Sequence, residues 1–124
     1  MSDTDKILVV EDNDFVRMQI VRFLSDSGYQ TIEGTDGEEA LQAMSKDIAL
    51  AIVDVRMEPI GGFEFIKSIR GCEMDTPVIL VTGDDNPDLL NEAARWSVAA
   101  VLMKPVQRDR LVKMVERTIR GGKR

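Results

Sequence analysis

The sequence predicts an α/β fold, a doubly wound sheet of five parallel strands flanked by five helices. Short apolar runs alternate with segments whose apolar residues recur at helical spacing, and there is no internal repeat. The apolar runs are continuous, as in parallel strands that are buried on both faces. The 124 residues and a hydrophobic fraction of 44% suit one compact domain, 1–124, with a core of about 6–120.

The first half of the chain contains three predicted strands and two predicted helices. Lys6–Val10 is the first strand, and a helix follows that Gly28 ends. The apolar face of this helix is formed by Val16, Ile20, Phe23 and Leu24. The next elements are a short strand at Tyr29–Glu33, a helix at Glu38–Lys46 with Ala40, Leu41 and Met44 facing inward, and a central strand at Ala49–Val53.

The second half continues the alternation after a loop, Arg56–Gly61, that contains Pro59. The predicted elements are a helix at Phe63–Arg70, a strand at Val78–Val81, a helix at Asp88–Arg95, a strand at Ala99–Met103 and a last helix near Arg108–Arg120. The apolar face of the last helix consists of Leu111, Val112, Val115 and Ile119. Right-handed crossovers between these strands place helices on both faces of the sheet.

Polar residues follow four of the predicted strands at the point where each strand ends. They are Glu11-Asp12, Asp54, Thr82 and Lys104. Because the carboxyl ends of parallel strands open onto one crevice, we expect these side chains to converge there. Three carboxylates, one hydroxyl and one ammonium group would then share a pocket.

Three carboxylates at short range need a cation between them, because they cannot otherwise all remain ionised. Mg²⁺, with Mn²⁺ as an alternative, suits hard oxygen ligands and binds through carboxylates and phosphate oxygens. Thr82 and Lys104 would then face an incoming anion, as in sites that stabilise a transferring phosphoryl group. Asp54 is the carboxylate left to act as a nucleophile.

Each of these residues also has a plainer interpretation. The run Asp12-Asn13-Asp14 would cap the helix that follows, a role that is compatible with metal binding. Capping is disfavoured for Asp54, since the next helix begins only near Gly62. Taken alone, Lys104 would be a solvated lysine and Thr82 an ordinary strand-end residue, and it is their combination with the carboxylates that favours a reaction centre.

Four motifs resemble those of bacterial response-regulator receiver domains, such as the chemotaxis regulators: Ile7–Asn13, Val53–Met57, Leu80–Gly83 and Met103–Pro105. The similarity runs from about Lys6 to Arg120. The resemblance implies the strand order 2-1-3-4-5 and a cis bond between Lys104 and Pro105. It further implies site roles: Glu11 and Asp12 as the metal-binding pair, Asp54 as phosphoacceptor and metal ligand, the main-chain carbonyl of Arg56 as a metal ligand, and Thr82 and Lys104 as phosphoryl-binding residues.

The resemblance implies a signalling switch of a two-component system rather than an enzyme. Asp54 would take a phosphoryl group from a phosphohistidine in a Mg²⁺-dependent reaction that the domain itself catalyses, and autodephosphorylation would reset it. The chain contains no histidine, so a donor phosphohistidine has to come from another protein, and the resemblance implies a histidine kinase or a histidine phosphotransfer protein. The downstream target, or an attached output domain, stays open.

Three alternatives are less well supported by the residues. Phosphatases and mutases of the haloacid-dehalogenase type need an Asp two residues after the nucleophile, where this chain has Arg56. A flavodoxin-like nucleotide binder should cradle phosphate after its first strand, where Glu11–Asp14 would repel it. A phosphorylation-independent scaffold or interaction domain is expected to lose at least one of the five key residues, and none is lost.

The chain departs from the family pattern at several positions that affect switching. Val101 stands where relatives often have a Tyr or Phe that is thought to move together with Thr82, so the usual readout is in doubt. Gly61 and Ser97 stand where Asp and Gly, respectively, are common. Arg56 and Asp84 either pair across the mouth of the site and slow hydrolysis of the acyl phosphate, or are both solvated.

Charge is unevenly distributed along the chain. The net charge is −6, but residues 104–124 carry +6 and residues 1–103 carry −12. The last helix is either a solvated helix with cations near its C-terminus, or a basic face that pairs with acidic residues of a partner or of a second copy. Related receivers often signal through the fourth helix, fifth strand and fifth helix, and the same surface of this chain is a candidate homodimer interface.

The composition also excludes some partners. A pI of about 4.7 and an aromatic fraction of 5% argue against direct binding of nucleic acid. No stretch of 18 or more apolar residues and no signal-like start is present, so we expect a soluble cytoplasmic protein without contact to a membrane.

Overall fold

The structure, a computed structural model, describes residues 5–84 and 86–122. The strands are β1 (Lys6–Val10), β2 (Gln30–Gly34), β3 (Ile48–Asp54), β4 (Val78–Thr82) and β5 (Ala100–Met103). The helices are α1 (Asp14–Asp26), α2 (Gly37–Ala43), α3 (Gly62–Gly71), α4 (Pro87–Arg95) and α5 (Arg108–Gly122). The strands pair in parallel in the order β2-β1-β3-β4-β5, which confirms the predicted fold and strand order.

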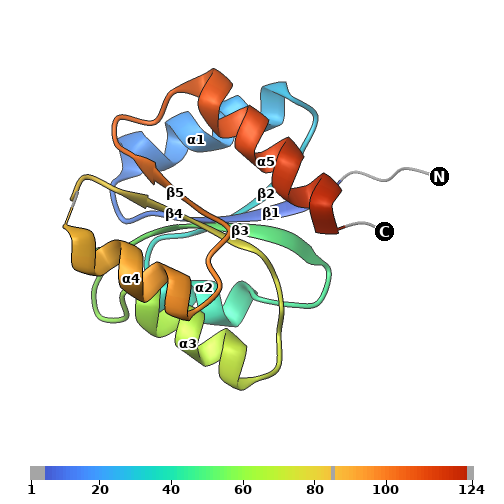
Figure 1. The fold of residues 1–124 in the computed structure, drawn as a ribbon. Coiled ribbons are helices and arrows are strands. Elements are labelled where there is room, and N and C mark those ends of the chain that lie inside the picture. Colours follow the sequence, from blue (N-terminus) through green and yellow to red (C-terminus); the bar gives the residue numbers. More distant parts are fainter. Residues whose placement is uncertain (1–4, 85, 123–124) are drawn as a thin grey trace.

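The sheet lies between two layers of helices (Figure 1). Helices α1 and α5 cover one face, and helices α2, α3 and α4 cover the other. Successive residues of β1 point to opposite faces, so Ile7 packs with Leu111 of α5, whereas Leu8 belongs to the apolar cluster of Phe65 on α3. Both faces of the central strands are therefore dry, which explains why their sequences are apolar throughout instead of alternating.

Helix α2 differs most from the sequence prediction. We predicted Glu38–Lys46, but the helix ends at Ala43, and Met44 is already extended with φ −68° and ψ 137°. The reason is a turn at Ser45, whose carbonyl accepts the N–H of Ile48 and whose hydroxyl accepts the N–H of Asp47, both at 3.2 Å. A serine turn of this kind competes with helix continuation. Met44 still packs against the core, but from the cap position rather than from the helix.

The other predicted boundaries coincide with those in the structure or differ from them by one or two residues, and helix α4 shows how a helix start is fixed. Helix α4 begins with Pro87, and Asn86 caps it by accepting the N–H of Asp88 at 2.9 Å. Helix α5 buries Leu111 and Val115 against the sheet. None of the described helices combines the length and the apolar character needed to cross a bilayer.

The register of the sheet brings the carboxyl ends of four strands to one edge. Val10 pairs with Val53, Asp54 with Val81, and Thr82 with Met103. The residues that end or follow β1, β3, β4 and β5 therefore lie next to one another across the sheet. This edge carries the candidate site.

Candidate functional site

The polar residues predicted from the strand ends do converge. They line a cleft of about 580 Å³ at the carboxyl edge of the sheet. The lining residues are Glu11, Asp12, Asn13, Asp54, Arg56, Thr82, Gly83, Asp84 and Lys104. Two flanking residues that had no predicted role as ligands, Asn13 and Gly83, complete the wall.

Glu11 leaves β1 and is held by its own loop. Its side chain is 1% exposed, and the N–H of Asn13 donates to Glu11 Oε2 at 3.1 Å. Asn13 in turn caps α1 by accepting the N–H of Val16 at 3.0 Å. Capping therefore falls to Asn13, which leaves the neighbouring carboxylate of Asp12 exposed at the cleft.

Lys104 connects the buried carboxylates. Its Nζ lies 3.1 Å from Glu11 Oε1 and 3.5 Å from Asp54 Oδ1. The backbone N–H of Lys104 donates to the carbonyl of Thr82 at 2.8 Å, which extends the pairing of β5 with β4 up to the cleft. The bond from Lys104 to Pro105 is cis, in agreement with the geometry that the family resemblance implies.

Burial and charge together set the pKa values at this site. Burial raises the pKa of Glu11 to about 7, and the N–H of Asn13 and the ammonium of Lys104 oppose that rise. Burial also raises the pKa of Asp54, against the effect of Lys104. Burial lowers the pKa of Lys104, but its contacts with Glu11 and Asp54 outweigh this effect and raise it above the ordinary value. The carboxylates thus carry an electrostatic cost that a second cation would relieve.

The carboxylates fit a divalent metal. Glu11, Asp12 and Asp54 each offer an oxygen, and these oxygens lie within 4.8 Å of one another. Glu11 Oε1 is buried and has no hydrogen-bond partner among the described residues, although Lys104 lies near it. A set of oxygen donors with unused acceptor capacity suits Mg²⁺ or Mn²⁺ better than a metal that prefers nitrogen or sulfur. Arg56 also lines the cleft, and its backbone N–H acts against the rise in the pKa of Asp54 that burial causes.

Thr82 and the Arg56–Asp84 pair form the opposite wall. Thr82 is 2% exposed, and its Oγ1 accepts the N–H of Asp84 at 3.0 Å, while its own hydroxyl hydrogen has only a 3.5 Å contact with the carbonyl of Asp84. Arg56 pairs with Asp84 at 2.7 Å, so of the two arrangements left open by the sequence the structure has the paired one. Arg56 remains 79% exposed in that pair.

The structure contains features that sequence reasoning missed. Arg17 contacts Glu11, Asp14 and Glu33 from the first turn of α1. The only local signal was a cation near the start of a helix, where the dipole disfavours it. A second cis bond, at Glu58–Pro59, lies in the loop after β3. Val101, by contrast, is half-buried and packs against the apolar cluster on the side of α3 and α4, as an aliphatic strand residue does.

This arrangement defines a class of protein, namely a doubly wound domain with a buried acidic cluster, a hydroxyl and a lysine at the carboxyl edge of the sheet. A family model described as "Response regulator receiver domain" matches residues 7–116. The chain belongs to this family of signalling domains.

Relatives and solved structures agree with that assignment. The chain is 34% identical over 114 residues to the CAI-1 autoinducer sensor kinase/phosphatase CqsS of Vibrio cholerae, and 25% identical over 114 residues to the chemotaxis protein CheY of Treponema pallidum. These matches cover 89% of the chain in each case, but 17% of the kinase and 79% of the chemotaxis protein. The chain thus spans only a small part of the length of some relatives that it matches.

Among solved structures, chemotaxis protein CheY4 of Vibrio cholerae superposes with a TM-score of 0.85 at 30% identity, covering 93% of this chain and 98% of that one. The receiver domain of the putative response regulator NarL from Mycobacterium tuberculosis gives a TM-score of 0.88 at 28% identity, covering 97% and 99%. The sequence relatives and the solved structures therefore both support a receiver domain with this fold.

Proposed function

We propose that the chain is a phosphoacceptor switch in which Asp54 receives a phosphoryl group from a phosphohistidine of a partner protein. The observation that carries the proposal is the position of Lys104. Its ammonium group lies within 3.5 Å of carboxylate oxygens of both Glu11 and Asp54 at the carboxyl edge of the sheet. A cation held between a metal-binding carboxylate and a candidate nucleophile suits transfer of an anionic group.

The transfer is a displacement at phosphorus. One carboxylate oxygen of Asp54 attacks, an O–P bond forms, and the N–P bond to the donor histidine breaks. The electron pair of that bond returns to the imidazole nitrogen, which takes up a proton from solvent. Water later attacks the acyl phosphate, which releases inorganic phosphate and regenerates the Asp54 carboxylate.

Seven of the nine residues that line the cleft have a proposed part in this reaction. Glu11, Asp12, Asp54 and the carbonyl of Arg56 would hold Mg²⁺ or Mn²⁺, which, when bound, offsets the negative charge of the transferring group. Lys104 binds a phosphoryl oxygen, and Thr82 donates its hydroxyl hydrogen, which has only a long contact at present. The pair of Arg56 with Asp84 narrows the mouth and slows the approach of water.

A protein donor is supported by the surface beside the cleft. Helix α1 starts at the cleft, and its first turns leave Phe15 76% exposed and Met18 64% exposed. These two side chains and Phe23 border an apolar hollow of about 420 Å³. Exposed large apolar residues that cluster next to a reaction centre favour a macromolecular partner. The proposed donor is a histidine kinase or a histidine phosphotransfer protein, and the proposed location is the cytoplasm.

A second surface supports the output side of the switch. Leu90 of α4 is 56% exposed and Met103 of β5 is 43% exposed, and α5 presents Arg110, Arg117 and Arg120 to solvent. We propose that the surface of α4, β5 and α5 binds an acidic downstream partner or a second copy. Replacing the three arginines with Glu should abolish that association, and unchanged self-association and partner binding would contradict it.

The proposed function is tested by intact mass after incubation with Mg²⁺ and acetyl phosphate. We expect one added phosphoryl group on the native chain, and none on Asp54→Asn or in the presence of a chelator. Asp47→Asn is the matched control, because this exposed carboxylate precedes β3 at the opposite edge of the sheet and should leave labelling intact. No modification from any donor would favour a phosphorylation-independent scaffold instead.

A further inference from the structure

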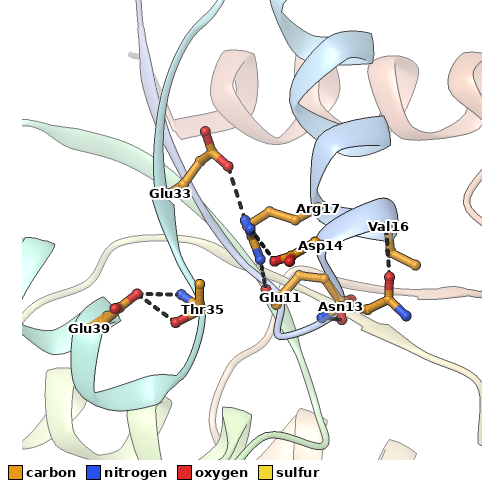
Figure 2. Close-up of polar contacts among 8 residues, drawn as sticks. All are labelled: Glu11, Asn13, Asp14, Val16, Arg17, Glu33, Thr35 and Glu39. Carbon is orange, nitrogen blue, oxygen red and sulfur yellow. Dashed lines mark hydrogen bonds and ion pairs between the residues drawn. The ribbon is translucent and has the colours of Figure 1, made fainter.

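Arg17 ties three parts of the fold together behind the acidic cluster. Figure 2 shows its guanidinium between the end of β1, the start of α1 and the edge strand β2. The group donates to the backbone carbonyl of Glu11 at 2.8 Å, to Glu33 Oε1 at 3.0 Å and to Asp14 Oδ1 at 2.6 Å. Three separate nitrogen atoms make these three contacts, so each nitrogen of the planar guanidinium donates at least one hydrogen bond.

The location of this cation is unfavourable unless its contacts compensate. Arg17 lies in the first turn of α1, where the helix dipole favours anions rather than cations. Its side chain is only 12% exposed, so it has also lost most of its hydration. Asp14 and Glu33 offset both costs, and because they are 80% and 49% exposed, they can retain part of their own hydration while doing so.

The contact with Glu11 is different from the two ion pairs, because it fixes main chain. The carbonyl of Glu11 belongs to the peptide group that joins Glu11 to Asp12. On the other side of the residue, the N–H of Glu11 donates to the carbonyl of Gly34 at 3.0 Å. Both backbone polar groups of Glu11 are therefore held, one by β2 and one by Arg17, at the point where the chain turns toward the cleft.

We propose that Arg17 is a positioning residue for the metal site, because it fixes the Glu11–Asp12 peptide and so sets the spacing of those two carboxylates before a cation arrives. This inference rests on the proposed function in one respect, since it takes Glu11 and Asp12 as metal ligands. The competing explanation is that Arg17 has only a structural role and holds α1 against β2. In that case replacing Arg17 would lower the stability of the fold alone, whereas replacing a positioning residue would also lower the affinity for the metal.

The test measures Mg²⁺ binding directly, by calorimetry, on the native chain and on Arg17→Ala, Arg17→Lys and Arg22→Ala. Outer-shell partners of metal ligands typically change metal affinity by about 10- to 100-fold, so we expect Arg17→Ala to weaken Mg²⁺ binding by about tenfold or more. Arg17→Lys should give an intermediate loss, because an ammonium group lacks the planar fork. Arg22→Ala, an exposed residue of the same helix, should bind as the native chain does.

Two further measurements distinguish a positioning role of Arg17 from a purely structural one. The rate of labelling by acetyl phosphate, followed against Mg²⁺ concentration, should shift to higher Mg²⁺ in Arg17→Ala while the rate at saturating Mg²⁺ stays within about twofold of native, because the reacting groups are untouched. In metal-free protein, the amides of Asp12 and Asn13 should exchange with solvent faster in that variant.

The outcomes distinguish this inference from the proposed function. An Arg17→Ala variant that melts at a lower temperature but binds Mg²⁺ with native affinity overturns the inference and leaves the phosphoacceptor proposal intact. A native chain that neither binds Mg²⁺ nor accepts a phosphoryl group overturns both. If Arg17→Ala does not fold, Arg17→Lys decides the matter, and native Mg²⁺ affinity in that variant overturns the inference.

Discussion

Replacing Glu11 with Gln should stabilise the metal-free protein at high pH. The Glu11 carboxyl group is 1% exposed, and burial raises its pKa from 4.5 to about 7. A raised carboxyl pKa means that the folded state holds the proton more tightly than the unfolded chain does. This group therefore costs nothing below a pH of about 4.5, and its cost grows as the pH rises and is complete above about 7.

The size of the effect follows from that difference. At about 1.4 kcal/mol for each pKa unit, the rise from 4.5 to about 7 corresponds to about 3 kcal/mol of stability that the native protein lacks at high pH. Gln has the same shape without the charge, but it also loses the contact with Lys104 at 3.1 Å. We therefore expect a gain of about 1 to 3 kcal/mol, or about 4 to 12 °C in melting temperature for a chain of this size.

The assay is thermal unfolding with a chelator present, at a pH of about 5 and again at about 8.5. Glu11→Gln should melt close to the native chain at the lower pH and well above it at the higher pH. Glu38→Gln, an exposed position on α2, is the control and should behave as native at both. Adding Mg²⁺ should then stabilise the native chain more than Glu11→Gln. A variant that melts at or below the native temperature at pH 8.5 would refute the reasoning.

Three other predictions address the mouth, the backbone and the donor surface. Arg56→Ala should leave the melting temperature almost unchanged, because exposed ion pairs contribute about 0 to 1 kcal/mol, but it should shorten the lifetime of the phosphorylated form by about two- to fivefold. A lifetime equal to that of the native chain would contradict a role of Arg56 in excluding water. Gly62→Ala should cost about 1 to 3 kcal/mol in a denaturant titration, because its Cβ would lie 2.4 Å from the carbonyl of Asp54, whereas Gly71→Ala, with nothing within 4 Å, should cost nothing. Phe15→Ser combined with Met18→Ser should keep native labelling by acetyl phosphate but slow transfer from phosphohistidine proteins by about tenfold or more, since each buried apolar side chain contributes about 1.5 to 3 kcal/mol; equal slowing with both donors would rule out a docking role.

The strands and the residues that end them could be predicted because their signal is local. A strand buried on both faces needs a continuous apolar run, and a polar residue at its end has one place to go, the carboxyl edge of the sheet. For this reason Glu11, Asp54, Thr82 and Lys104 were found without a structure, and all of them line the cleft. The roles of these residues remain predictions until the labelling experiment is done.

The features that sequence reasoning missed depend on contacts that a local pattern does not contain. Helix α2 ends early because the carbonyl and the hydroxyl of Ser45 accept the N–H groups of Ile48 and Asp47, which follow it in the chain. The apolar spacing up to Met44 alone still fits a helix. Arg17 of α1 donates a hydrogen bond to Glu33 of β2, which is 16 residues further along the chain. Ser97 is a further example. Glycine is common at this position in relatives because the backbone there has a positive φ, and Ser97 keeps that conformation with a φ of +57°.

Val101 raises the question of how phosphorylation at Asp54 would reach the output surface without an aromatic side chain. The hydrogen bonds after β4 offer a route. Thr82 Oγ1 accepts the N–H of Asp84, and Asp84 Oδ1 accepts the N–H of Asn86, which caps α4. If the Thr82 hydroxyl turned toward a phosphoryl group, this set of bonds would rearrange at the start of α4. Signal transfer would then pass through the backbone of the loop rather than through a rotating ring.

This reasoning makes a measurable prediction, because the single tryptophan of the chain, Trp96, caps the C-terminus of α4 and its indole N–H donates to Glu92. We expect phosphorylation to change the Trp96 emission in the native chain. The change should be absent in Thr82→Ala at an equal degree of phosphorylation checked by intact mass, because that variant lacks the hydroxyl that links the acceptor to α4. An emission change of native size in phosphorylated Thr82→Ala would show that the signal reaches α4 by another path, and the exposed Leu90 and Met103 would then be the places to look for it.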